Sequence, residues 1–153
     1  YCFSHRKESR ANFKAMITAQ AEARQANYSK FELAYAEAKQ TGLKAGQEII
    51  PIPMVVQQHE SPINDNSPVV KQWHVPDGPC GFAWVTIRPG NSQFANWLKK
   101  EGYATKAYYG GVEIWVREFN QSVTRKQACA DAMAEVLRKH FPELSIYAGS
   151  RLD

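Results

Sequence analysis

Aromatic and basic side chains share one side of two segments in the second half of the chain. In one expected strand Phe82, Trp84 and Arg88 point the same way, because side chains along a strand alternate between its two faces. Trp115 and Arg117 do the same in a second expected strand. Aromatic rings beside arginines form platforms on which single-stranded bases stack. Nucleic-acid binding is therefore one hypothesis for these five residues.

The alternate positions of the same two strands are aliphatic, which predicts that the opposite face is packed beneath helices. These positions are Ala83, Val85, Ile87, Val112, Ile114 and Val116. Three occupants of the aromatic side stay open: a helix or connector of this chain, a second subunit or protein partner, and nucleic acid. The Lys/Arg-Gly-aromatic run of the common RNA-recognition motif is absent around Gly111, and Glu113 would repel phosphate.

Catalytic chemistry has little support in the sequence. Cys80 lies near His74 and Asp77, and a Cys/His pair can form an activated nucleophile, but two prolines stiffen the intervening chain. A structural thiol is the simpler interpretation. The four histidines lack ligand spacing, and no phosphate-binding glycine loop follows a strand. We therefore expect no catalytic residue, no metal site and no cofactor, and the sequence favours a non-enzymatic role.

Composition and charge are those of an ordinary globular chain. The 153 residues are 44% hydrophobic and carry a net charge of +4, with an acidic stretch between two basic ends. No apolar run reaches the roughly 20 residues of a membrane span, and no secretory leader is visible, so we expect an intracellular setting without a membrane. Three distant cysteines, Cys2, Cys80 and Cys129, predict no disulfide framework.

The first 50 residues predict a helical arm. Residues 9–41 are rich in alanine and contain no proline or glycine, which favours helix. Asn27-Tyr28 suggests a break, after which Ser29 and Glu32 form a capping box and Gly42 ends a second helix. Its apolar stripes are narrow, so the arm is expected to need a partner surface.

Residues 51–79 predict an extended connector. Six of the eight prolines of the chain fall in this segment. Because proline lacks the amide hydrogen and fixes φ, we expect neither a regular helix nor a central strand here. Short apolar stretches, Met54 to Val56 and Val69-Val70, are expected to adhere to other parts of the protein.

Residues 80–153 predict a β-α-β-β-α-β unit. Asn91 or Ser92 begins the first helix and Gly102 ends it, while Thr124 with Gln127 begins the second. This order is that of a ferredoxin-like α+β sandwich, in which the first and third strands are central neighbours. The expected strands are 81–88, 104–109, 112–119 and 144–148, and the expected helices are 91–100 and 124–140.

Three stretches together resemble a group of small, uncharacterised proteins encoded by tailed bacteriophages. They are residues 76–84, the run from Tyr108 to Trp115, and the terminal Tyr147 to Asp153. The likeness covers residues 51–153 and implies a viral protein in the host cytoplasm or the virion. With the helical arm it leads to one functional expectation, a structural or accessory assembly protein that binds a protein partner or forms a homo-oligomer. The alternative is a small basic nucleic-acid-binding protein.

Overall fold

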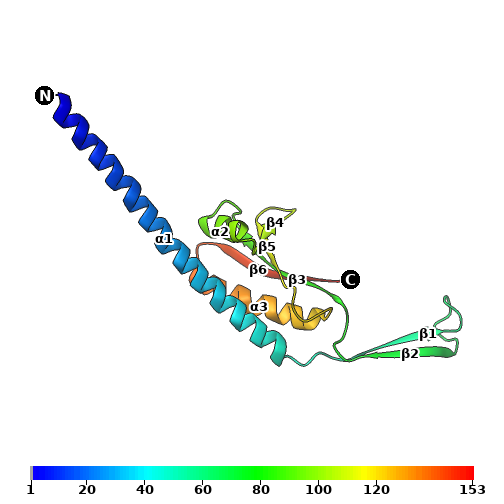
Figure 1. The fold of residues 1–153 in the computed structure, drawn as a ribbon. Coiled ribbons are helices and arrows are strands. Elements are labelled where there is room, and N and C mark those ends of the chain that lie inside the picture. The colour runs from blue at the N-terminus through cyan, green and yellow to red at the C-terminus, as the bar shows by residue number, and fades with distance from the viewer. Residues whose placement is uncertain (1) are drawn as a thin grey trace.

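The structure is of the α+β class, with a long helix, a separate hairpin and a four-stranded sheet (Figure 1). The computed structural model describes residues 2–153, with side chains from His5 onward, and within that range there are three helices and two antiparallel sheets. The elements are α1 (Cys2–Glu48), β1 (Met54–His59), β2 (Val69–Val75), β3 (Gly81–Arg88), α2 (Gln93–Glu101), β4 (Thr105–Lys106), β5 (Val112–Trp115), α3 (Val123–His140) and β6 (Ser145–Leu152).

The larger sheet has the strand order β4-β5-β3-β6, and every neighbouring pair is antiparallel. The first and third strands of this region, β3 and β5, are therefore adjacent at the centre, as the order of elements predicted. Their register places Trp84 opposite Trp115. β6 pairs with β3 along its whole length, from Ser145 opposite Arg88 to Leu152 opposite Gly81.

One face of this sheet is covered by helices and forms the hydrophobic core. The predicted aliphatic positions of β3 and β5 are all buried, and α3 packs on β3 and β6. Phe31 of α1 completes the core, with its ring centroid 5.4 Å from that of Phe94 and 5.7 Å from that of Phe141. The second half of α1 thus belongs to the same helical layer as α2 and α3.

α1 is one continuous helix, so the expected break at Asn27-Tyr28 and the expected end at Gly42 were wrong. The Ser29 hydroxyl donates to the Gln25 carbonyl oxygen at 3.1 Å, a bond made inside a helix, and does not form a cap. Gly42 is helical because α3 lies against it. A Cβ there would stand 2.6 Å from Met133 Cγ and 2.9 Å from the Cys129 carbonyl oxygen. Gly46 is in similar contact with Phe119 and the Arg125 carbonyl oxygen.

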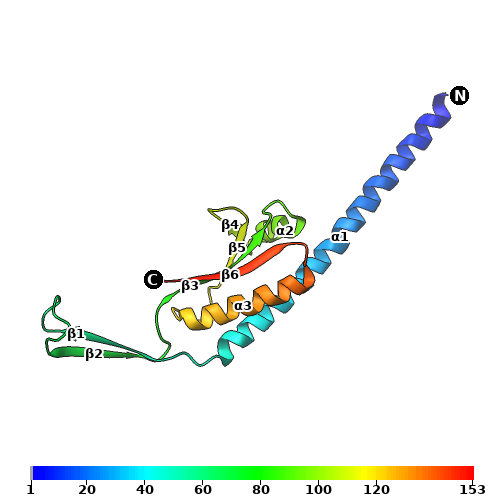
Figure 2. The same cartoon turned by 180° about the vertical axis from the view of Figure 1, so that it is seen from behind.

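The first half of α1 projects from the sheet domain. Residues 5–27, the free half of α1, are all exposed and extend about 35 Å at roughly 1.5 Å per residue. The hairpin of β1 and β2 projects in the opposite direction, and the two views agree on this (Figures 1 and 2). The molecule is therefore elongated, with one appendage at each end.

The expected extended connector contains a two-stranded antiparallel hairpin, a pairing that the sequence analysis did not predict. Its prolines flank the paired segments and do not interrupt them, which leaves the ladder from Met54 opposite Val75 to Gln58 opposite Lys71 intact. The intervening turn is held by Ser67, whose hydroxyl donates to the Asn64 carbonyl oxygen at 2.7 Å.

Four further boundaries differ from the sequence prediction. β4 has only two residues, and Tyr108 and Tyr109 lie in an exposed loop beyond it. β5 ends before Phe119, whose φ of 68° turns the chain away. Ser122, and not Thr124, accepts the capping hydrogen bond of α3. β6 continues beyond Ala148 to Leu152, because β3 offers it partners over its whole length. Of the two predicted caps of α2, Asn91 and Ser92, the structure has Ser92, and the predicted end Gly102 is confirmed.

Replacing Gly42 with alanine tests the close contact between α1 and α3. Alanine normally favours a helix over glycine by about 1 kcal/mol. Here the added methyl group meets a backbone carbonyl, so we expect the free energy of unfolding in urea to fall by about 1–3 kcal/mol. The neighbouring exposed substitution Thr41→Ala serves as the control and should cause no loss. A Gly42→Ala protein as stable as the wild type would contradict the packing described.

Candidate functional site

Three aromatic side chains meet on the sheet face that carries no helix. Phe82 and Trp84 of β3 and Trp115 of β5 form this cluster, which we call the aromatic face. The ring centroids of Trp84 and Trp115 are 5.0 Å apart, and those of Phe82 and Trp115 are 6.1 Å apart. The predicted phasing of the two strands is therefore confirmed, since both indoles lie on one side.

Of the three occupants that the sequence left open for this face, the structure excludes the helical arm and the connector. α1 packs against α3 and α2, on the other side of the sheet. The hairpin of β1 and β2 lies clear of the sheet in both views (Figures 1 and 2). Within residues 2–153 no helix or strand lies over the aromatic face, and its three rings are only partly buried. The face is available to a ligand or partner.

Each indole is fixed by a specific contact. Trp84 lies over Gly149 of β6, where an added Cβ would stand 2.8 Å from its Nε1 and 2.9 Å from its Cε2. The register places Trp84 between this backbone and Trp115, and its ring is partly buried. Trp115 donates from Nε1 to the Glu113 carboxylate at 3.1 Å. The rings are thus held in place before any ligand arrives.

The structure places the cations of this face differently from the sequence prediction. Lys126 and Arg151 approach Phe82, with Nζ and Cζ at 5.6 and 5.2 Å from its ring centroid. Neither was predicted. Arg151 would have followed from extending the last strand, because it pairs with Phe82 in the register, whereas Lys126 comes from α3 and has no signal in the strand pattern.

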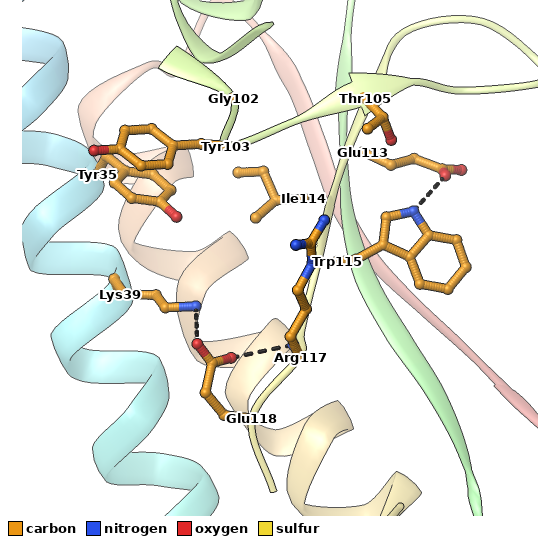
Figure 3. Close-up of a pocket in the computed structure, with 10 residues that line it drawn as sticks. All are labelled: Tyr35, Lys39, Gly102, Tyr103, Thr105, Glu113, Ile114, Trp115, Arg117 and Glu118. Atoms are coloured by element: carbon orange, nitrogen blue, oxygen red, sulfur yellow. Dashed lines mark hydrogen bonds and ion pairs between the residues drawn. The ribbon is translucent and has the colours of Figure 1, made fainter. Parts of the chain in front are cut away.

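The two predicted arginines do not join the cluster. Arg88 lies at the far end of β3, donates to the Tyr109 carbonyl oxygen at 3.2 Å and stands 5.7 Å from the ring centroid of Tyr147. Arg117 follows β5 and lines a pocket at the outer edge of that strand. Figure 3 shows Arg117 and Trp115 leaving the backbone in different directions.

That pocket has a volume of about 150 Å³ and lies between α1 and β5 (Figure 3). Lys39 Nζ and the Glu118 carboxylate form an ion pair at 2.6 Å along it. Burial is the largest single influence and would raise the pKa of Glu118. The hydrogen bond and charge of Lys39, together with backbone hydrogen bonds, outweigh burial and lower that pKa below its ordinary value. Tyr35 stacks on Tyr103 with centroids 4.3 Å apart. Lys39 and Glu118 are therefore partners of each other within the fold, which favours a structural role for this pocket.

No catalytic constellation is formed by the described residues. Burial raises the pKa of the Cys129 thiol to about 11, so it is a poor nucleophile. Cys80 is exposed, and among the hydrogen bonds of the described residues none joins it to His74. Asp77 instead faces Arg125, with a carboxylate oxygen 3.5 Å from its Nε. The side chain of Cys2 lies outside the described residues.

Metal-binding clusters are absent among residues 5–153. His, Cys, Asp and Glu side chains do not gather there in groups of three or more that could hold a metal ion. None of the described helices has the length and hydropathy needed to span a bilayer.

Comparisons with protein families, curated proteins and solved structures found no match to this chain.

Titration of Tyr35 tests the packing beside the pocket. Burial, with smaller contributions from Tyr103 and Glu118, raises the pKa of Tyr35 from 10.0 to about 12. The unfolded chain therefore releases this proton first as pH rises, so the free energy of unfolding should fall between pH 10 and 12. Tyr35→Phe should remove that part of the decline, whereas Tyr109→Phe, in an exposed loop, should not. Denaturant unfolding at several alkaline pH values measures both, and an unchanged decline in Tyr35→Phe would refute the assignment.

Proposed function

We propose that this protein is a structural or accessory component of an assembly and acts through protein–protein contacts. The observation that carries the proposal is its surface area. A compact monomer of 17.3 kDa exposes about 7,800 Å², whereas this chain exposes 10721 Å². The excess of about 2,900 Å² is more than three times the roughly 800 Å² that one partner contributes to a standard interface.

The free half of α1 contributes much of that excess. Phe13, Met16 and Ile17 are spaced to share one side of the helix and are all about half exposed or more. In water, the helical conformation of this segment is supported only by its alanines and by its continuity with the packed half of α1. A partner helix or groove would bury these three side chains, and apolar burial supplies the main free energy of association.

The hairpin of β1 and β2, at the other end of the molecule, exposes apolar side chains on both of its faces. Its exposed aliphatic side chains are Val55, Val56, Val69 and Val70. Trp73 is 41% exposed, and the Lys71 ammonium lies 4.8 Å from its ring centroid. An isolated two-stranded hairpin is marginally stable in water, so contacts with another molecule would also stabilise it. Two appendages at opposite ends suit a component that links neighbours.

The fold and setting form the remaining parts of this proposal. We assign the region from β3 to β6 to the ferredoxin-like class, which its order of elements and strands supports. The resemblance of residues 51–153 to small proteins of tailed bacteriophages suggests a virion or an infected bacterium as the setting. The physical argument for assembly does not depend on that setting.

Charged substitutions in the free half of α1 test the assembly role. We expect the wild-type chain to self-associate at tens of micromolar in sedimentation velocity. The double variant Met16→Glu/Ile17→Glu should weaken the association about 30-fold or more, because it places charge in the centre of an apolar contact. The matched control Ala15→Glu/Thr18→Glu adds the same charge to the opposite, exposed side of the same helix.

Limited proteolysis provides the second measurement of this test. Protease should cleave the free half of α1 more slowly in the wild type than in the double variant, since association shields it. A monomeric wild type whose free half is cleaved as fast as that of the double variant contradicts self-assembly through this helix.

A second function, binding of single-stranded nucleic acid, is supported by the open aromatic face. The partly exposed rings of Phe82 and Trp84 and the exposed Arg151 combine a stacking platform with positive charge. We expect single-stranded oligonucleotides to quench tryptophan fluorescence, and added salt to weaken binding steeply. Trp84→Ala should weaken binding about tenfold or more, while Trp73→Ala in the hairpin should not. Absence of quenching at low salt would exclude this function.

A further inference from the structure

β6 forms one long, open edge of the main sheet. It has eight residues, pairs with β3 on one side only and has no neighbouring strand on the other among the described residues. The opposite edge, β4, is reduced to two residues and includes Lys106. Short strands and lysines are common means of preventing an edge from pairing with another chain. Only one of the two edges of this sheet is protected in that way.

The register identifies the backbone groups that face outward from β6. In antiparallel sheets the residues of a strand hydrogen-bond alternately to the left and the right neighbour. Val116 donates to the Ala83 carbonyl oxygen at 3.0 Å, so the odd-numbered residues of β3 bond to β5 and its even-numbered residues to β6. In β6 the odd-numbered residues thus bond to β3, and the outward groups belong to Ile146, Ala148, Ser150 and Leu152.

An observed side-chain contact agrees with this assignment. Arg138 donates from Nη1 to the Ile146 carbonyl oxygen at 3.0 Å, which requires that this oxygen face away from β3. A carbonyl oxygen has two lone pairs, so it can accept a second hydrogen bond. At the other end of the strand, Asp153 donates to the Cys80 carbonyl oxygen at 3.1 Å and continues the odd-numbered series toward β3.

β6 also lacks the usual means of protection against pairing. It contains no proline, lysine or acidic residue, its register with β3 has no bulge, and Arg151 is its one charged side chain. Leu152, at the end of the strand, is 67% exposed. A long, regular and nearly uncharged edge with an exposed leucine is a template for strand addition.

We infer that β6 pairs in antiparallel orientation with β6 of a second copy of this chain, about a two-fold axis at Gly149. In this register Ala148 bonds with the partner's Ser150, and Ile146 with the partner's Leu152. Counting both halves, about eight backbone hydrogen bonds form across the axis. The occupant is a second copy because the edge is self-complementary in this register.

The side chains support this register on both faces. On the helical side Ile146 stands opposite the partner's Leu152, an apolar pair that covers the exposed leucine. On the aromatic side Tyr147, which is 40% exposed, stands opposite the partner's Arg151, a cation–π pair. A shift of two residues in either direction separates both pairs. The result is a continuous sheet whose two aromatic faces lie on the same side.

This inference deepens the proposed assembly role by naming one partner and one contact, but the contact does not involve the free half of α1. The experiment therefore uses the full chain carrying Met16→Glu/Ile17→Glu, with reductant present. We expect this variant to be monomeric at the tens of micromolar at which the wild type associates, and to form a dimer at hundreds of micromolar in sedimentation velocity. Ser150→Pro in that background should raise the dissociation constant about tenfold or more, because proline removes an outward amide and leaves the β3–β6 ladder intact.

A second variant and a residue-specific measurement keep the test independent of any folding defect. Leu152→Lys places charge at the strand end and should weaken the dimer similarly, while Leu33→Lys on exposed α1 is its matched control. Amide hydrogen exchange should show slow exchange at Ala148 and Ser150 in the dimer and fast exchange in the monomer. Tyr147 and Gly149, which bond to β3, should exchange slowly in both.

Three results would overturn the inference. They are a monomer at every concentration, a dimer unaffected by Ser150→Pro and Leu152→Lys, and fast exchange at Ala148 and Ser150 under dimeric conditions. If the double variant Met16→Glu/Ile17→Glu is monomeric at every concentration while the wild type associates, the proposed function stands and the β6 pairing is refuted. The two failures are therefore distinguishable.

Discussion

The alternation of side chains along β3 determines most of this structure. β3 is hydrogen-bonded on both sides, so its odd-numbered side chains are committed to the helical core and its even-numbered ones to the opposite face. A shift of one residue would bury Trp84 beneath α3 and expose Val85. The same constraint sets which backbone groups of β6 face outward. The core, the aromatic face and the open edge are thus three results of one register.

The second requirement is the close approach of α1 to α3. α2 has only nine residues, and α1 supplies part of the cover that the sheet needs. Two glycines on α1 allow the backbones to come close, and Phe31 fills the space between α2 and the end of α3. This contact explains why a helix with so weak an apolar stripe is ordered, since its packed half provides a template for the exposed half.

The sequence was sufficient for features that depend on local pattern. The alternation in β3, the cap Ser92 and the end Gly102 of α2 are decided by residues within a few positions of one another, and the structure confirms them. The continuity of α1 through Gly42 depends on Met133 and Cys129, which lie far along the chain. The pairing of Met54–His59 with Val69–Val75 likewise depends on where the prolines fall relative to the ladder, and not on how many there are.

The candidate site divides in the same way. Phe82, Trp84 and Trp115 were predictable because strand periodicity and strand adjacency place them. Arg117 was misplaced because β5 ends early, and Lys126 was missed because its position depends on how α3 packs. The sequence left the cover of this face open for a related reason. An alanine-rich helix can pack on either side of a sheet, and the glycines that match it to α3 decide which.

The continuity of α1 has a mechanical consequence. The segment that reaches into solvent and the segment that carries Phe31 and Gly42 are the same rigid rod, about 70 Å long at roughly 1.5 Å per residue, with no joint between them. A force applied near the tip of α1 is therefore transmitted along the helix to the residues that it contributes to the hydrophobic core. Whatever holds that tip also restrains the centre of the protein.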